Sequence, residues 1–177
     1  MDRRPATPEE VRALANPLRI RILRACLDEA LTNKEIASRL GRDPGTTLHH
    51  VRLLVETGFL APEEERRGAR GSIERPYRAT GKSWTLDVGD APDATRALVD
   101  AFRAEISAVS TSDIRTLSRL GVRLVPSVRE AFEERIKTLV DDLKEADDAA
   151  GEPFGFFVGM HRRRDDAPAP RPPGRRS

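Results

Sequence analysis

Two closely spaced helix signals in residues 33–58 constrain this chain more than any other feature of its sequence. Thr32-Asn33-Lys34-Glu35 has the form of a capping box and predicts a short helix that ends at Gly41. Asp43-Pro44 has the form of an N-cap followed by proline at the first helical position, and predicts a second helix that stops at Gly58. Two short helices joined by a turn of three residues are typical of a helix-turn-helix.

The second of these helices separates apolar from polar side chains. Its apolar face consists of Leu48, Val51, Leu54 and Val55. The opposite face is predicted to present Thr46, Thr47, His49, His50 and Arg52. Short polar side chains near the start of a recognition helix suit base edges in the major groove, and an arginine one turn later can reach phosphate or guanine. We therefore expect this face to be a DNA-binding surface.

Residues 59–79 predict a β-hairpin that would form the wing of such a domain. The Gly-rich turn at 68–71 is flanked by Arg66, Arg67 and Arg70, which could approach the DNA backbone or a narrow minor groove. Pro76 requires a strand end or an edge. The acidic run 63–65 opposes this role, so it either lies at the base of the strands or partly cancels the arginines.

The chain before residue 30 predicts two further helices. Thr7-Pro8-Glu9-Glu10 fits a capping box, and Asn16-Pro17 fits an N-cap with proline at the first helical position. In the second helix, Ile22 and Cys26 belong to the apolar face, with Cys26 as a small core residue. The arginines at 19, 21 and 24 are expected to occupy the rest of the surface.

Beyond residue 84 the chain predicts amphipathic helices. One apolar seam consists of Leu98, Phe102, Ile106 and Val109, and a second consists of Val128, Phe132, Ile136, Leu139 and Leu143. Residues 114–120 either continue the first helix or form a separate one. The apolar run 154–160 is plausible as a strand, with no role assigned, and 161–177 has the composition of a disordered tail.

Charge is distributed unevenly along the chain. The net charge is +2, but residues 1–83 carry 16 basic and 12 acidic side chains whereas residues 84–150 carry 9 basic and 14 acidic ones. The first segment could approach a polyanion, and the second would be repelled by one. The second segment therefore suits dimerisation or the docking of a protein.

Three blocks of the sequence resemble ArsR-type winged-helix regulators. They are residues 14–23 (LANPLRIRIL), 31–41 (LTNKEIASRLG) and 46–60 (TTLHHVRLLVETGFL). The resemblance covers about residues 8–82 and implies a homodimeric transcriptional regulator that binds DNA through a winged helix. Metal-sensing members carry a Cys-x-Cys motif near the third helix or Asp, His and Glu ligands on the C-terminal helix. Residues 31–42 contain no cysteine and residues 84–150 no histidine, so no metal or other cofactor is expected.

Other classes of protein fit the sequence less well. A single cysteine excludes an internal disulfide and any multi-cysteine metal site. No phosphate-binding glycine loop or nucleophile motif is present, so we expect no enzymatic activity and no catalytic residue. The chain lacks a secretory signal and any apolar run that could span a membrane, so a cytoplasmic location without membrane contact is expected.

The sequence thus predicts a mainly α-helical fold with a small β-hairpin wing. The expected domains are a winged helix-turn-helix at 8–82, a helical dimerisation or effector region at 93–160 and a tail at 161–177. The expected function is that of a transcriptional regulator, a repressor, which binds a palindromic double-stranded DNA operator as a homodimer. The alternatives are a winged helix that docks protein, and a regulator that responds to a small molecule bound at the domain junction, whose identity the sequence does not reveal.

Overall fold

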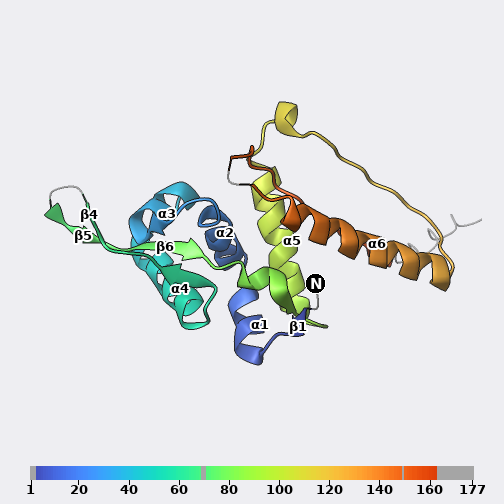
Figure 1. Cartoon of the computed structure of the whole chain (residues 1–177), viewed down its shortest axis with the longest axis horizontal. Helices are drawn as coiled ribbons and strands as arrows, with labels where there is room; N and C mark the ends of the chain where they lie inside the picture. Colours follow the sequence, from blue (N-terminus) through green and yellow to red (C-terminus); the bar gives the residue numbers. More distant parts are fainter. Residues whose placement is uncertain (1–2, 69–70, 149, 163–177) are drawn as a thin grey trace, which may run out of the picture. The chain divides into compact units, whose positions relative to one another are not determined.

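The computed structural model describes residues 3–68, 71–148 and 150–162 (Figure 1). The chain divides into two compact units, Met1–Arg115 and Thr116–Ser177. We refer to the first as the winged unit and to the second as the C-terminal unit. Among the described residues, no helix has the length and apolar character that a membrane span requires.

The described part of the winged unit contains five α-helices, and its sequence-predicted caps are confirmed. The helices are α1 (Pro8–Leu14), α2 (Pro17–Ala25), α3 (Asn33–Leu40), α4 (Pro44–Glu56) and α5 (Pro92–Ile106). Thr7 and Thr32 form capping boxes, and the side chains of Asn16 and Asp43 accept backbone N–H groups at the starts of α2 and α4. Gly41 ends α3 in the left-handed conformation at φ 61°, which favours glycine.

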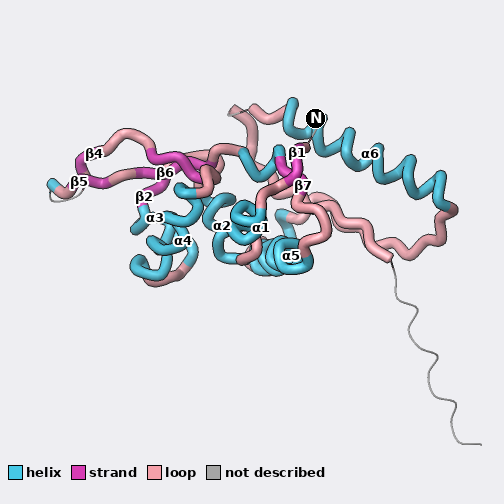
Figure 2. Tube along the Cα trace, turned by 90° about the horizontal axis from the view of Figure 1, so that it is seen from below, coloured by secondary structure: helices cyan, strands magenta, loops and turns pink. Residues whose placement is uncertain are grey.

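Short strands complete the winged unit (Figure 2). A three-stranded antiparallel sheet has the order β2 (Leu31–Thr32), β6 (Pro76–Ala79) and β3 (Leu60–Pro62). The hairpin extends beyond it as β4 (Arg66–Arg67) paired with β5 (Ile73–Glu74). β1 (Arg4–Pro5) and β7 (Leu86–Asp87) form a parallel pair, and a 3₁₀ turn spans Lys82–Thr85. Pro76 begins its strand, as its missing N–H requires.

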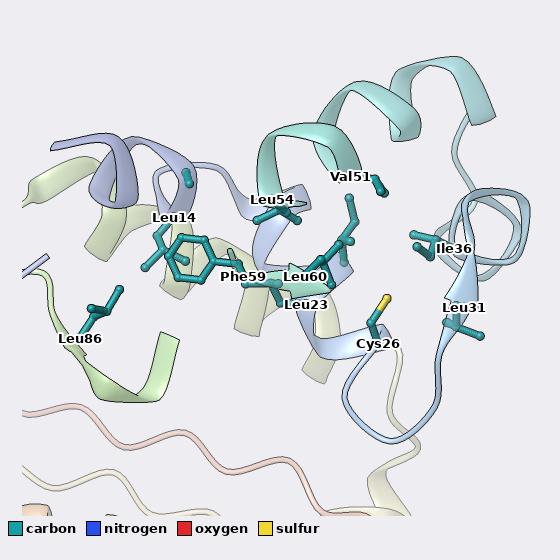
Figure 3. Close-up of a cluster of buried hydrophobic side chains, with 12 residues drawn as sticks. Leu14, Leu23, Cys26, Leu31, Ile36, Val51, Leu54, Phe59, Leu60 and Leu86 are labelled. Carbon is teal, nitrogen blue, oxygen red and sulfur yellow. The ribbon is translucent and has the colours of Figure 1, made fainter. Parts of the chain in front are cut away.

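The core of the winged unit lies between the helices and β3 (Figure 3). Phe59, Ile22, Ile36 and Leu54 are its largest fully buried apolar side chains. Cys26 is also fully buried, which confirms it as a core residue, and burial raises the pKa of its thiol to about 12. Burial of the helix-turn-helix against this core fixes the direction in which α4 faces outward.

Helix α5 packs on α1 and α2 through small residues rather than through its large ones. Ala94, Ala97 and Ala101 are buried, whereas Leu98 and Val99 are about half exposed. The helix ends at Ile106, and residues 114–120 form neither a continuation of it nor a separate helix, so both alternatives for this segment are wrong. A 3₁₀ turn at Thr111–Asp113 lies between α5 and this segment. Small side chains allow close helix packing, which leaves the larger ones on the outer face.

The C-terminal unit contains one long helix among its described residues, α6 (Pro126–Glu145). None of its described residues is buried, although the apolar positions of α6 follow the predicted seam. Residues 154–160 form no strand, so that prediction is wrong. Within the predicted tail, residues 163–177 lie outside the described residues.

Candidate nucleic-acid interface

The start of α4 is held firmly to the preceding helix. The Asp43 side chain accepts the backbone N–H of Thr46 at 2.8 Å, and Asn33 Nδ2 donates to the carbonyl of Pro44 at 2.9 Å. The second bond joins the first turn of α3 to the first turn of α4. The N-terminal turn of α4 therefore has a fixed position, as a helix that reads base edges requires.

One face of α4 is open to solvent. Thr46, His49 and Arg52 follow one another at intervals of three residues and are all exposed. Side chains at this spacing lie on the same side of a helix. Of the five residues predicted on α4, these three have the orientation that a contact with DNA needs.

Thr47 does not belong to this face, and its predicted outward orientation is wrong. Its side chain is fully buried and its hydroxyl donates to the carbonyl of Asp43 at 2.9 Å. Thr47 precedes Val51 by four residues, so the helical period itself places it on the core side. A threonine there satisfies its hydroxyl within the helix and does not need solvent or DNA.

His50 lies between the open face and the core. It is half-buried, and its Nδ1 lies 3.4 Å from Nη1 of Arg19. Its ring also meets the ring of His49 edge to face at 5.7 Å between centroids. Burial lowers the pKa of His50, and the charges of Arg19 and of His49 lower it further.

The wing presents its predicted arginines differently. Arg66 Nη2 contacts both carboxylate oxygens of Glu35, at 2.6 and 2.8 Å. The backbone of Arg67 pairs with Ile73, but its side chain is exposed and forms no hydrogen bond or ion pair with any residue that the structure describes. Arg70 lies outside the described residues. Arg67 is thus available to a phosphate, while Arg66 is engaged with the capping box of α3.

Two of the three carboxylates in the acidic run before the wing are paired locally. Glu63 pairs with Arg78, and Glu65 pairs with Arg75 at 2.5 Å. Both partners belong to the return half of the hairpin, at its base. The structure therefore fits the first alternative, in which these carboxylates lie at the strand base. It fits less well the second, in which they cancel the positive charge of the arginines beside the turn.

Arg19 is a residue that the sequence reasoning misplaced. It was expected on the surface, but it is only 9% exposed. Its Nε donates to the carbonyl of Ala13 at 2.5 Å and its Nη2 to that of Arg12 at 2.6 Å. The sequence did contain a signal, since Arg19 precedes Ile22 and Leu23 by three and four residues and so shares their buried face.

Lys82 and Glu10 brace the other end of α4 and were also missed. Lys82 Nζ donates to the carbonyl of Thr57 at 2.5 Å and contacts Oε1 of Glu10 at 2.8 Å. Glu10, itself buried, also pairs with Arg4 at 2.6 Å. Hydrogen bonds from Arg4, Lys82 and the backbone of Thr7 hold the pKa of Glu10 far below its ordinary value.

A comparison with protein families agrees with this arrangement in the part that carries α3 and α4. Residues 14–63 match the family HTH_20, described as a helix-turn-helix domain. The crystal structure of a "Possible transcriptional regulator for arsenical resistance" is 22% identical, with a TM-score of 0.33, and the match covers 59% of this chain and 100% of that one. A structural similarity of that size establishes no shared function. No curated protein matches the chain.

The family match and the structure agree on the helices and on the turn between them. The first matched residue lies at the end of α1, and the last lies just beyond β3. The mainly helical fold with a β-hairpin wing is confirmed. Residues 14–63 are a helix-turn-helix domain within a winged-helix fold, as the resemblance to ArsR-type regulators implied.

Proposed function

We propose that this protein is a sequence-specific DNA-binding transcriptional regulator of the ArsR type that places α4 in the major groove. The observation that carries this proposal is the open face of α4, where Thr46, His49 and Arg52 stand on a helix whose start is fixed by Asp43 and Asn33. Such side chains can donate to purine N7 and guanine O6, and Arg52 can also bind a phosphate.

Charge supports the approach of this unit to DNA. Residues 1–83 carry a net charge of +4, and two carboxylates at the wing base, those of Glu63 and Glu65, are paired with arginines of the same hairpin. Arg67 extends this positive surface to the wing. Because a wing arginine beside glycines follows the phosphate backbone, its contribution is to affinity more than to base choice.

We propose further that the active form is a homodimer on a palindromic operator. The apolar seam of α6 supports this, because Val128, Phe132, Leu139 and Leu143 are each 40–44% exposed in the single chain. A second copy that covers this seam would remove it from water. A twofold dimer that reads two half-sites needs its recognition helices about one DNA turn apart, ~34 Å.

We propose repression as the regulatory outcome for a dimer that binds such an operator. A dimer bound across a promoter excludes polymerase from the same DNA. The test is transcription in vitro from a promoter that overlaps the selected operator. Repression predicts less transcript as protein is added, and an increase would show an activator instead.

The deciding experiment for DNA recognition is selection of bound sequences from a random pool of double-stranded DNA. A palindromic consensus with half-sites about one helical turn apart would support recognition by a dimer. Binding to all sequences with equal affinity would overturn sequence-specific recognition. Absence of binding at low salt would overturn DNA binding altogether, since non-specific contacts are strongest there.

Single variants then locate the contacts. Arg52→Ala should weaken binding to the selected operator by about 1–3 kcal/mol, and Thr46→Ala should relax the choice of base at one position. Arg96→Ala is the matched control, because Arg96 is an exposed helical arginine on α5 paired only with Asp93 three residues away. Equal effects of Arg52→Ala and Arg96→Ala would remove α4 from the interface.

A further inference from the structure

Arg19 is immobilised at the end of α1 by two backbone carbonyls. Its Nε and Nη2 donate to the carbonyls of Ala13 and Arg12 at 2.5 and 2.6 Å. These carbonyls belong to the last turn of α1, where backbone partners are incomplete, and that of Arg12 accepts only a long bond of 3.3 Å from the Ala15 N–H. The guanidinium is therefore held in place by contacts that have nothing to do with α4.

The remaining nitrogen of the same group faces α4. Arg19 Nη1 lies 3.4 Å from Nδ1 of His50. A guanidinium is always charged and only donates hydrogen bonds. If Nδ1 of His50 were protonated, its N–H would point at the N–H of Arg19, and two donors would face each other. Nδ1 therefore has to accept the hydrogen bond. In the neutral ring the proton is then on Nε2.

The ring of His50 is also kept neutral by its surroundings. The charged and titratable groups that face it are Arg19 from α2 and His49 from α4 itself, and both oppose a positive charge on His50. Partial burial acts in the same direction. No described carboxylate faces the ring to offset these effects.

Nε2 of His50 remains available to a partner outside the chain. Nε2 forms no hydrogen bond with any described residue. Among the described residues, the only buried side-chain polar atom without a partner is Oδ1 of Asn33. Nε2 is therefore not buried. His50 thus has one nitrogen turned to Arg19 and another that reaches solvent beside the open face of α4.

We propose that Arg19 is a positioning residue that fixes His50 as a neutral ring with its proton on Nε2, and so presents an uncharged hydrogen-bond donor to DNA. This inference rests on the proposed function of α4. A neutral N–H suits purine N7, guanine O6, thymine O4 or a phosphate oxygen. Because no charge is involved, this contact releases no counterion and its loss should not alter the salt dependence of binding.

The tautomer can be read by nuclear magnetic resonance without DNA. The chain has three histidines, so a His49→Gln/His161→Gln background leaves His50 alone. Long-range ¹H–¹⁵N correlation at pH 7 should show an unprotonated Nδ1 and a protonated Nε2. A protonated Nδ1, or an imidazolium at that pH, would overturn the proposal whether or not the protein binds DNA.

Substitution of Arg19 then separates positioning from folding. In the same background, Arg19→Met should give a mixture of tautomers and raise the pKa of His50, while Arg19→Lys, which keeps a positive donor, should change both less. If Arg19→Met does not fold, the tautomer and the pKa of His50 are compared between Arg19→Lys and its parent, and this comparison decides whether Arg19 positions the proton. Identical spectra and titration in all folded variants would show that Arg19 does not set the proton position.

Operator binding supplies the functional readout. Relative to the wild-type chain, His50→Ala should weaken binding by about tenfold with an unchanged salt slope, as expected for one uncharged base contact. In the Arg19→Met variant, binding should strengthen by about threefold from pH 8 to pH 6 as His50 gains a proton near DNA. No loss with His50→Ala would overturn the role in DNA recognition. Failure of the wild-type chain to bind any DNA would instead count against the proposed function, and the nuclear magnetic resonance spectra would still decide the tautomer.

Discussion

The two units of this chain bury their apolar residues very differently. In the winged unit, Phe59 is 1% exposed and belongs to a continuous core. In the C-terminal unit, Phe132 is 44% exposed and no described residue is buried, although α6 has a regular apolar seam. Helices in proteins owe most of their stability to the packing of an apolar face. The winged unit therefore has a core of its own on which to fold, whereas we expect the C-terminal unit to need a partner surface.

The sharpest test of this comparison is the same truncation in both units. Phe59→Ala should destabilise the winged unit by about 3–5 kcal/mol. Phe132→Ala should cost less than about 1 kcal/mol in the dilute monomer, where the ring loses mainly a contact with the Arg135 guanidinium 5.3 Å away. Urea denaturation followed by fluorescence of Trp84, the single tryptophan, reports on the winged unit. If Phe59→Ala and Phe132→Ala lowered the free energy of unfolding measured at Trp84 by the same amount, the two units would not fold independently.

Disruption of the α6 seam should have the next largest effect. Phe132→Asp/Leu139→Asp should convert a dimer to a monomer, because two charges would be placed in the surface that a second copy covers. Operator affinity should then fall by about 100-fold or more, since linked half-site binding is lost. Sedimentation at micromolar concentration measures the first effect and operator titration the second.

The control for that variant uses the opposite face of the same helix. Glu134→Ala/Lys137→Ala removes an exposed pair at 3.2 Å and should leave both the mass and the affinity unchanged. A monomeric wild-type protein that binds its operator at full affinity would remove the seam from the function of the protein.

The elements that the sequence predicted well depend on local chemistry. The caps at Thr7, Asn16, Thr32 and Asp43 act within a few residues, so the sequence alone places the starts of α1 to α4. The parallel pair of β1 and β7 joins residues about 80 positions apart and carries no such signal. The packing of α5 through alanines was missed because the prediction considered only the seam of larger residues, Leu98, Phe102, Ile106 and Val109, as the face through which this helix makes contacts.

The candidate site was predicted less completely than the fold. Thr46, His49 and Arg52 have the expected orientation, and the helical period could have excluded Thr47. The pairing of Arg66 with Glu35 joins residues 31 positions apart and depends on where the hairpin folds relative to α3. No local pattern shows that a wing arginine will meet a carboxylate that also caps a helix.

Acid should expose a second difference between the units, because Glu10 forms a buried charge cluster in the winged unit. Its pKa is lowered from the ordinary value of 4.5, so its contribution to stability is complete above that pH and is lost progressively as the pH falls below it. Glu10→Gln should cost about 1–3 kcal/mol at pH 7 and flatten the acid dependence of unfolding at Trp84.

Glu9 is the matched control for this change, because it is the exposed neighbour in the same helical turn. Glu9→Gln should alter the unfolding free energy at pH 7 by less than about 0.5 kcal/mol. An acid profile that is the same for wild type and Glu10→Gln would place the acid-sensitive group elsewhere.

The smallest expected effect separates the units by their contact with DNA. Arg67→Ala in the wing should weaken binding to all sequences by a similar small factor and lower the slope of log K against log salt by about 0.9, as one lost phosphate contact does. Arg66→Ala should lower it less, because Glu35 already neutralises that guanidinium. Arg123→Ala, at an exposed position of the C-terminal unit, should change neither the affinity nor the slope. An unchanged slope with Arg67→Ala would remove the wing from the interface. A lowered slope with Arg123→Ala would show that the C-terminal unit contacts DNA. Contrary to our proposal, DNA binding and partner binding would then not be separated between the two units.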